Sequence, residues 1–368
     1  MSMRVLVVNA GSATWKLSLL DGDESVATRH VDAADVETGT KALDAVLAEW
    51  GHPDAVGHRI VHGGGHFSEA VRIDHEVRAK LGSFVPLAPL HQPSGVAGID
   101  AVLNVLPDVP SVACFDTAFH TTLPRAASTY AIPSEWREAK GVDVRRYGFH
   151  GLSHAYASRR AAEMVGRSLD ELRIVVCHLG AGASLCAVQQ GRSVDTTMGF
   201  TPLEGLVMAS RSGDVDPGLV VWLVRDAGVG IEDCHDGLQH RSGLVGLAGT
   251  PDMREVLQRV ESGDGAARLA LEVYLHKLRA GIAAMTASLG GLDILVFTGG
   301  VGEHAPVVRS GAVDGLGFLG LGIDAVLNAH AQPDVEISAP GAAARCVVIE
   351  AREDIQIARE VRHAVGAA

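Results

Sequence analysis

The stretch Arg4–Gly22, RVLVVNAGSATWKLSLLDG, decides the fold because the chain repeats its design at Arg173–Gly191, RIVVCHLGAGASLCAVQQG. The two stretches align without a gap, with Gly11 on Gly180. Each predicts an apolar strand, a tight turn that contains glycine, and a second apolar strand. Two copies of one strand–turn–strand unit predict two similar halves that face a shared cleft.

The rest of the chain alternates apolar, β-rich runs with helical patterns, which is typical of an α/β protein. The clearest helix is expected over residues 265–289, with Asp264 as its N-cap and Gly290 directly after its end. The strands are expected in the runs RVLVVNAG, AVGHRIVHGGG, SVACFDTAFH, RIVVCHLGAG, DILVFTGGVG and RCVVIEARED.

Length and charge narrow the class of protein. The 368 residues suffice for roughly two domains, and the formal net charge is -13. A nucleic-acid or anionic-membrane surface would need a basic face, so we expect neither partner. A small anionic substrate remains compatible, because a few arginines in a cleft can dominate the local field.

Cysteine usage and apolar run lengths indicate a cytoplasmic protein. The five cysteines form no CxxC pair and lie mostly in apolar runs, which favours buried, reduced thiols over a metal site or disulfides. Near the N-terminus only VLVV is apolar, which is too short for a signal peptide. No apolar run approaches the roughly 18 residues of a membrane span.

The glycine turns have two interpretations. Glycine permits a positive φ and lets backbone N–H groups approach an anion, so each turn could bind phosphate. Each could also be an ordinary hairpin turn. A third glycine-rich turn, FTGGVGEH at Phe297–His304, follows a predicted strand and precedes a possible helix, a junction that suits nucleotide phosphates. The chain contains no G-x-x-x-x-G-K-[ST] motif, so it is not a P-loop protein.

Polar residues interrupt apolar frames in several segments. The pair His150 and His154, four residues apart, could hold zinc on a helix, but Gly151 weakens a helix there and HExxH is absent, so we disfavour zinc. An arginine in an apolar cleft normally pairs with a carboxylate or a phosphate. Arg211 therefore either bridges a neighbouring aspartate of ASRSGDVDPG or meets a substrate. The other such residues are His58, Arg59, His62, Asp116, His120, Arg145 and Arg146.

Together these segments resemble the acetate kinase family, within the superfamily of acetate and sugar kinases, heat-shock ATPases and actin. The resemblance implies an α/β fold of two duplicated actin-like (ribonuclease H-like) domains with a nucleotide cleft between them. It places residues 1–117 with 355–368 in one domain and 118–354 in the other. It runs nearly end to end, through NAGSATWK, GHRIVHGG, PLAPLHQP, FDTAFH, RRYGFHGLSH, DTTMGFTPLEGLVMASRSGDVDPG, TGGVGEH and REDIQIAR.

The resemblance also implies roles for single residues. Arg59 would pair with a substrate carboxylate, and a small apolar pocket would hold its methyl group: Val61, Leu90, Phe149 and Pro202. The catalytic group would be Asp116, His150 and Arg211, and Asn9 and Glu353 would lie at the metal. The nucleotide would contact Asn9, Ser12, Thr14 and Lys16 in the first loop, His178, Gly180 and Gly182 in the second, and Asp252, Arg254, Gly300, Val301 and Gly302 on the adenosine side.

The activity implied is reversible transfer of the ATP γ-phosphoryl to acetate or propionate, with Mg²⁺ (Mn²⁺ as an alternative) in a homodimer. Alternatives are a longer acid such as butyrate, pyrophosphate or another nucleotide as donor, and an actin-like nucleotide switch. Departures from the family pattern gather around phosphate and nucleotide, so they bear on the donor more than on the acceptor. They are Ala13, Gln92, Leu152, Ala181 and His304.

Overall fold

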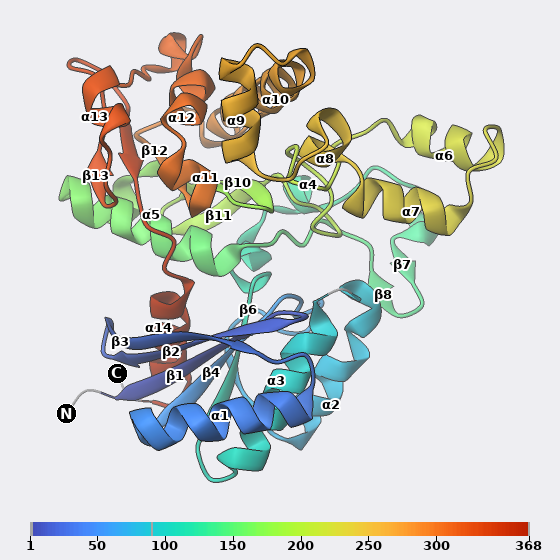
Figure 1. Cartoon of the computed structure of the whole chain (residues 1–368), viewed down its shortest axis with the longest axis vertical. Helices are drawn as coiled ribbons and strands as arrows, with labels where there is room; N and C mark the ends of the chain where they lie inside the picture. Colours follow the sequence, from blue (N-terminus) through green and yellow to red (C-terminus); the bar gives the residue numbers. More distant parts are fainter. Residues whose placement is uncertain (1–2, 90, 367–368) are drawn as a thin grey trace.

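The computed structural model describes residues 3–89 and 91–366, and a six-stranded sheet forms the core of its first half (Figure 1). The strand order is β3-β2-β1-β4-β6-β5, and β1, β4 and β6 run parallel while β2, β3 and β5 are antiparallel to their neighbours. The strands are β1 (Arg4–Ala10), β2 (Thr14–Asp21), β3 (Glu24–Asp32), β4 (Ala55–Ile60), β5 (Val71–Arg72) and β6 (Ser111–Phe115).

A second six-stranded sheet repeats this topology, in the order β11-β10-β9-β12-β14-β13. Its parallel and antiparallel pairings match those of the first sheet strand for strand. The predicted α/β fold with duplicated halves is therefore confirmed. The strands are β9 (Arg173–Leu179), β10 (Ala183–Gln189), β11 (Arg192–Thr196), β12 (Ile294–Thr298), β13 (Val335–Glu336) and β14 (Arg345–Val348), and β7 (Glu138–Ala139) and β8 (Val142–Asp143) form a separate small ribbon.

The two opening hairpins differ in register although their sequences align without a gap. In the first, Asn9 lies opposite Lys16; in the second, His178 lies opposite Ser184, one position earlier than the alignment gives. A one-residue change of register turns the aligned side chain to the other face of the sheet, so Ser184 is the counterpart of Lys16.

The turn glycines serve close approach and not, as we expected, a positive φ. A Cβ on Gly11 would lie 2.7 Å from the Thr14 carbonyl oxygen, and one on Gly180 would lie 3.3 Å from the Gly182 oxygen. Positive φ occurs instead at the later aligned pair, Gly22 and Gly191, with φ of 60° and 73°.

Helices and sheets alternate in layers (Figure 1). Helices α1 (Val36–Trp50) and α3 (Gln92–Val105) pack over the outer face of the first sheet, and α10 (Gly265–Leu289) packs on the outer face of the second. Between the sheets, α14 (Glu353–Ala364) contacts the first sheet and α5 (Gly151–Val165) contacts the second, and the two helices pack on each other. The apolar cluster around them includes side chains of both sheets, so one core joins the halves.

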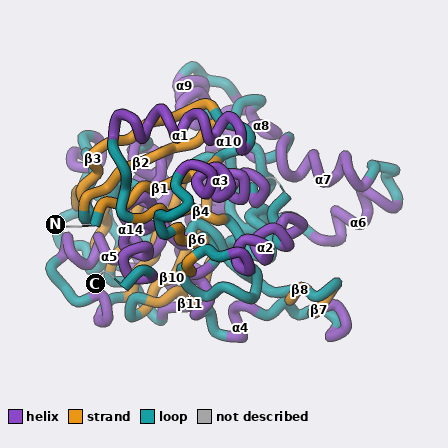
Figure 2. The backbone as a smooth tube through the Cα atoms, turned by 90° about the horizontal axis from the view of Figure 1, so that it is seen from below, coloured by secondary structure: helices purple, strands orange, loops and turns teal. Residues whose placement is uncertain are grey.

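Helix α10 confirms the clearest sequence prediction. Asp264 caps it by accepting from the N–H groups of Ala266 and Ala267, and Gly290 ends it in the left-handed conformation. Figure 2 shows that α6 (Pro217–Arg225) and α7 (Ile231–His240) project from the body. The remaining helices are α2 (His75–Ser83), α4 (Arg125–Ser128), α8 (Gly243–Ala248), α9 (Met253–Glu261), α11 (Gly299–His304), α12 (Pro306–Val313) and α13 (Ala325–Ala329).

The cysteines follow the expectation of reduced thiols, since all five are buried and free. Within residues 3–89 and 91–366, no helix has both the length and the apolar character needed to cross a membrane.

Candidate active site between the two halves

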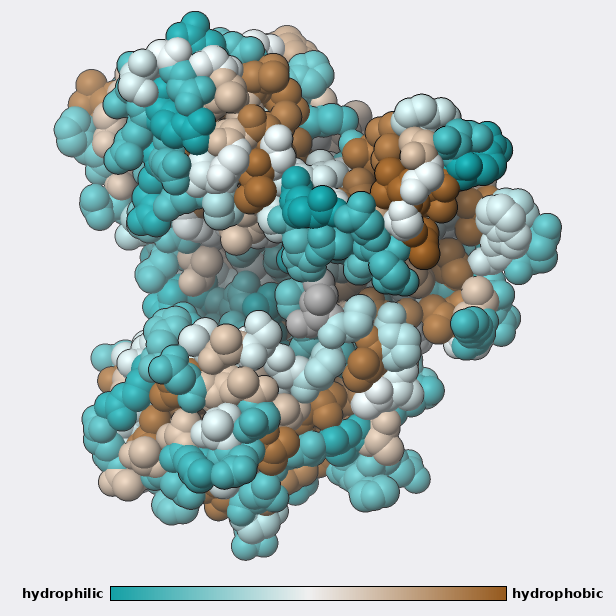
Figure 3. All heavy atoms as spheres, turned by 45° about the vertical axis from the view of Figure 1, so that its right-hand side comes forward, coloured by the Kyte–Doolittle hydropathy of each residue, from teal (hydrophilic) through white to brown (hydrophobic). Residues whose placement is uncertain are grey.

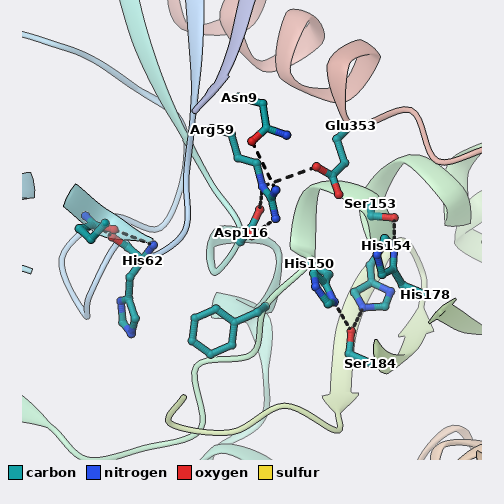
Figure 4. A network of polar contacts seen from close by, with 12 residues as sticks. Asn9, Arg59, His62, Asp116, His150, Ser153, His154, His178, Ser184 and Glu353 are labelled. Atoms are coloured by element: carbon teal, nitrogen blue, oxygen red, sulfur yellow. Dashed lines mark hydrogen bonds and ion pairs between the residues drawn. The ribbon is translucent and has the colours of Figure 1, made fainter. Parts of the chain in front are cut away.

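The predicted polar residues converge where strands of the two sheets end. Asn9 lies near the end of β1, Arg59 near the end of β4, and Asp116 directly follows β6. From the second half, His178 lies near the end of β9. Carboxyl ends of parallel strands meet at one edge of a sheet, and this edge is the usual ligand site of open α/β folds. Figure 4 shows Asn9 and Asp116 around Arg59, and His178 beside His150.

Arg59 is the centre of the charged cluster. Its Nε and Nη2 donate to the two carboxylate oxygens of Asp116 at 3.1 and 2.7 Å, and Glu353 Oε2 lies 3.5 Å from Nε. In the resting protein the carboxylate partners of this arginine are therefore protein side chains. Within residues 3–89 and 91–366, Nη1 makes only a long contact of 3.5 Å to Asn9 Oδ1, so its N–H groups remain available to another acceptor.

Burial and charge oppose each other in this cluster. Burial alone would lower the pKa of Arg59, but the charges of Asp116 and Glu353 raise it overall, so the guanidinium stays charged. Burial raises the pKa of Glu353; Arg59 lowers it, and Asp116 raises it further. Asn9, Lys16 and Glu353 also line a cavity of about 200 Å³ beside β1.

His150 stands at the start of α5 in a conformation that non-glycine residues rarely adopt. Its φ is 57°, in the left-handed region. The helix begins at Gly151, so the expectation that this glycine disfavours a helix is wrong. Gly151 is needed there because a Cβ would lie 2.3 Å from the Asp116 carbonyl oxygen, to which its own N–H donates at 2.8 Å. The turn therefore joins His150 to the strand end that carries Asp116.

A buried group of imidazoles and hydroxyls surrounds His150 (Figure 4). The His178 ring lies 4.3 Å from the His150 ring, and Ser153 Oγ is 2.8 Å from His178 Nδ1. Ser184 Oγ lies 3.0 Å from His150 Nδ1 and 2.8 Å from His154 Nε2. His150 and His154 are thus bridged by a serine.

The imidazoles of this group are neutral near pH 7. Burial lowers the pKa of His178 to about 4 and those of His150 and His154 well below the ordinary value. The charge of Arg59 lowers the pKa values of His150 and His178 further, and the neighbouring histidines lower that of His154. The sequence analysis missed Ser153 and Ser184. Ser184 could have been found from its place in the second hairpin, because it lies one residue before Leu185, the residue that the alignment puts opposite His178.

Arg211 differs from Arg59 because no carboxylate pairs with it among the described residues. Its Nη1 donates to the Pro202 carbonyl oxygen at 3.1 Å and lies 3.8 Å from Met208 Sδ. The alternative that it bridges Asp214 or Asp216 is therefore wrong. Burial lowers its pKa from the usual arginine value. A Cβ on Gly182 would lie 3.4 Å from Arg211 Nη1 and 3.3 Å from His150 Nε2, so both groups face this glycine.

Three of the predicted pocket residues belong to the described part of the chain. Phe149 is buried, and Val61 packs against the same apolar cluster. Pro202 is joined to the site through its carbonyl contact with Arg211. Leu90 lies outside the described residues. His91, which the sequence analysis left out, lies close enough to both arginines that their charges, after burial, lower its pKa.

The third glycine-rich turn, Phe297–His304, lies against the second hairpin, which is formed by β9 and β10. It forms α11, which packs against the end of β9, and a Cβ on Gly299 would lie 2.9 Å from the Leu179 carbonyl oxygen. Gly300 faces open space, Val301 is partly buried and Gly302 is buried. In the first hairpin, Ser12 and Thr14 are exposed.

Asp252 and Arg254, which were predicted to contact the nucleotide on its adenosine side, lie on the surface. Asp252 caps α9 and forms an ion pair with Arg254 at 2.7 Å. Of the departures, Ala13, Ala181 and His304 are exposed, whereas Gln92 and Leu152 are buried.

The oxygen atoms around Arg59 are of the type that Mg²⁺ prefers. Asn9, Asp116 and Glu353 turn amide and carboxylate oxygens toward the Arg59 guanidinium. Among the described residues no group of three or more His, Cys, Asp or Glu is arranged to hold a metal ion. A partial set of oxygen ligands is what Mg²⁺ commonly uses, because substrate phosphates and water complete its shell.

A larger groove, of about 2070 Å³, lies elsewhere, along α14, α5 and β5, and it contains none of the predicted site residues. The candidate catalytic residues therefore lie at the strand ends and not in this larger groove.

Comparison with known proteins agrees with this geometry. A family model described as the Acetokinase family matches residues 27–359. An acetate kinase of Leifsonia xyli subsp. xyli is 47% identical over 395 residues, covering 99% of this chain and 99% of that protein. Crystal structures of an acetate kinase from Porphyromonas gingivalis and a propionate kinase from Francisella tularensis superpose with TM-scores of 0.89 and 0.90 at 34% and 35% identity, each covering 99% of this chain and 100% of the other. The chain belongs to the acetokinase family, and its two matching sheets are the duplicated actin-like halves of that fold.

Proposed function

We propose that the protein transfers the γ-phosphoryl group of ATP reversibly to the carboxylate of acetate or propionate, giving an acyl phosphate and ADP. The observation that carries this proposal is the pair of unlike arginines in one site. Arg59 is paired but keeps Nη1 available, and Arg211 has no carboxylate partner among the described residues. The acceptor is supported by the acetate and propionate kinases among the chain's relatives.

The acceptor needs orientation and charge neutralisation but no general base, because a carboxylate is already a nucleophile. Arg59 Nη1 would bind one carboxylate oxygen, while Asp116 holds the guanidinium in place through its two hydrogen bonds. The methyl group would contact Phe149, Val61, Pro202 and Leu90. Fixing the carboxylate in line with the phosphoryl removes much of the entropic part of the barrier.

The donor side would supply positive charge where negative charge spreads in the transition state. Arg211 and His150 Nε2 both face Gly182, and they would donate to the oxygens of the transferring phosphoryl. Asn9, Ser12, Thr14 and Lys16 would contact phosphates from the first hairpin, and His178, Gly180 and Gly182 from the second. The exposed departures Ala13 and Ala181 keep their backbone N–H groups, so they are compatible with ATP as donor.

The adenosine side would be formed by Gly300, Val301 and Gly302 in α11, with Asp252 and Arg254 further out. Mg²⁺ would be held by Asn9 and Glu353, directly or through water, with Asp116 nearby. When bound, the ion would neutralise the phosphate charge. Removal of divalent ions with a chelator should abolish turnover, and Mg²⁺ or Mn²⁺ should restore it.

We also propose that the protein is a cytoplasmic homodimer with domains at residues 1–117 plus 355–368 and 118–354. The buried free cysteines support a reducing compartment. The projecting α6 exposes Leu219, Val221 and Trp222, with 44%, 54% and 52% of their surface accessible, which supports a contact with a second copy. Because α14 begins at Glu353, the second domain junction falls inside its first turn.

The test is an assay that traps acyl phosphate with hydroxylamine. Purified protein with Mg²⁺ and ATP should form hydroxamate with acetate or propionate, and much less with butyrate because the pocket is small. Pyrophosphate in place of ATP should give no product. ATP turnover that does not depend on any acid would overturn the proposal.

A further inference from the structure

One buried hydroxyl, Ser184 Oγ, lies between two imidazoles. It is 3.0 Å from His150 Nδ1 and 2.8 Å from His154 Nε2, and Ser184 itself is completely buried (Figure 4). A serine hydroxyl carries one hydrogen, so it donates to only one of the two nitrogens and must accept from the other. The hydrogen bonds from His154 through Ser184 to His150 must therefore all run in the same direction, and two directions are possible.

Both imidazoles are neutral, so each carries one proton. In the first arrangement, His154 Nε2–H donates to Ser184, and Ser184 donates to His150 Nδ1, which leaves the proton of His150 on Nε2. In the second arrangement every bond is reversed, and the proton of His150 lies on Nδ1. The arrangement therefore decides whether His150 Nε2 carries an N–H group or a lone pair at the candidate active site.

The surroundings favour the first arrangement. His154 Nδ1 is buried with no hydrogen-bond partner among the described residues. The second arrangement would put an N–H there without an acceptor, and unpartnered buried N–H groups are rare. It would also aim a lone pair of His150 Nε2 at the point beside Gly182 that Arg211 faces, where anionic oxygens are expected.

A second buried serine, Ser193, also forms a hydrogen bond with a histidine, His120, and the direction of this bond is clear. His120 Nε2 lies 2.9 Å from the Phe149 carbonyl oxygen, which only accepts, so Nε2 carries the proton. Ser193 Oγ, 2.8 Å from His120 Nδ1, must then donate to the imidazole. A buried serine thus fixes the tautomer of a neutral histidine next to the turn that carries His150.

We propose that Ser184 and His154 are positioning residues that hold His150 in the Nε2–H form, so that this N–H points at the transferring phosphoryl group. The tautomer is inferred from the burial and the hydrogen bonds of the resting protein. Only the use of the N–H rests on the proposed function.

The direct test is ¹⁵N NMR of the histidine side chains in the full chain without substrates. The His150 signals, assigned by their loss in His150→Gln, should show a protonated Nε2 and an unprotonated Nδ1. In Ser184→Ala the population with a protonated Nδ1 should rise. A protonated Nδ1 in the wild-type protein would overturn the proposal even if Ser184→Ala does not fold, and it would leave the acetate kinase activity untouched as a separate question.

Kinetics give the second test. Ser184→Ala should lower kcat about 10- to 100-fold, by analogy with the loss of an outer partner that orients a metal-bound histidine, with KM for acetate and ATP nearly unchanged. Ser184→Thr keeps the hydroxyl and should recover most of the turnover. The matched control is Ser158→Ala. It removes a similarly buried hydroxyl whose one hydrogen bond among the described residues is to the Ala155 carbonyl oxygen of its own helix, and its kcat should stay normal. Equal losses in Ser184→Ala and Ser158→Ala, or no rescue by threonine in a folded variant, would contradict the positioning role.

Discussion

The two hairpins that face each other across the site share a backbone plan and differ in electrostatics. On the first side, the cross-strand pair is Asn9 and Lys16, beside the ion-paired Arg59. On the second side, the equivalent pair is His178 and Ser184, beside neutral imidazoles and Arg211, which meets no carboxylate in the described part of the chain. The first side is already neutralised in the resting protein, whereas the second keeps a positive charge for an incoming anion. The two halves thus share one backbone plan, and their side chains give the two sides of the site different charges.

Of the variants that test this difference between the two sides, Arg59→Ala should have the largest effect on stability and kinetics. It removes the partner of the buried Asp116, so unfolding by urea should show a loss of about 3–5 kcal/mol. KM for acetate should rise strongly and kcat should fall. Arg78→Ala is the matched control, because Arg78 makes a similar two-point pair with Asp100 that is partly exposed, and it should cost at most about 1 kcal/mol. Unchanged KM in a folded Arg59→Ala would break the assignment.

Arg211→Ala should lower kcat about 10²- to 10³-fold, as when one donor to a developing negative charge is lost. KM for acetate should change far less. Stability should hold or increase, since no carboxylate loses a partner. Near-normal turnover in steady-state kinetics would remove Arg211 from the mechanism and with it the contrast between the two sides.

Gly182→Ala should lower kcat about 10-fold without unfolding the protein, because its methyl group would press on both His150 and Arg211 and displace them slightly. The control is Gly230→Ala, whose methyl group would meet nothing within 4 Å and should leave turnover unchanged. Equal kinetics for the two variants would show that the site does not need close approach at this glycine.

The smallest effect is expected for Asp252→Asn. Asparagine caps a helix as well as aspartate does, so the thermal midpoint should hold. If the residue also contacts the nucleotide, KM for ATP should rise a few-fold while KM for acetate stays constant. An unchanged KM for ATP would limit Asp252 to its role as the cap of α9.

The sequence predicted the strands, α10 and the duplication well, because these depend on local apolar patterns and on caps that lie next to the helix in the chain. It failed where a side chain's partner is set by tertiary packing. The register of the second hairpin moved Ser184, and not the aligned Leu185, to the position opposite His178. Arg211 has two aspartates nearby in sequence, yet the loop turns both away, to cap α6 and to bind the Gly205 N–H. Neither outcome is encoded in spacing alone.

The most direct test of the account is a crystal structure with Mg²⁺, ADP, acetate and a planar metal fluoride that mimics the phosphoryl group in flight. The account predicts that Arg59 Nη1 binds the acetate carboxylate, and that Arg211 leaves the Pro202 carbonyl oxygen to donate to the fluoride together with His150 Nε2. A fluoride bound away from Gly182, with Arg211 still on Pro202, would contradict it.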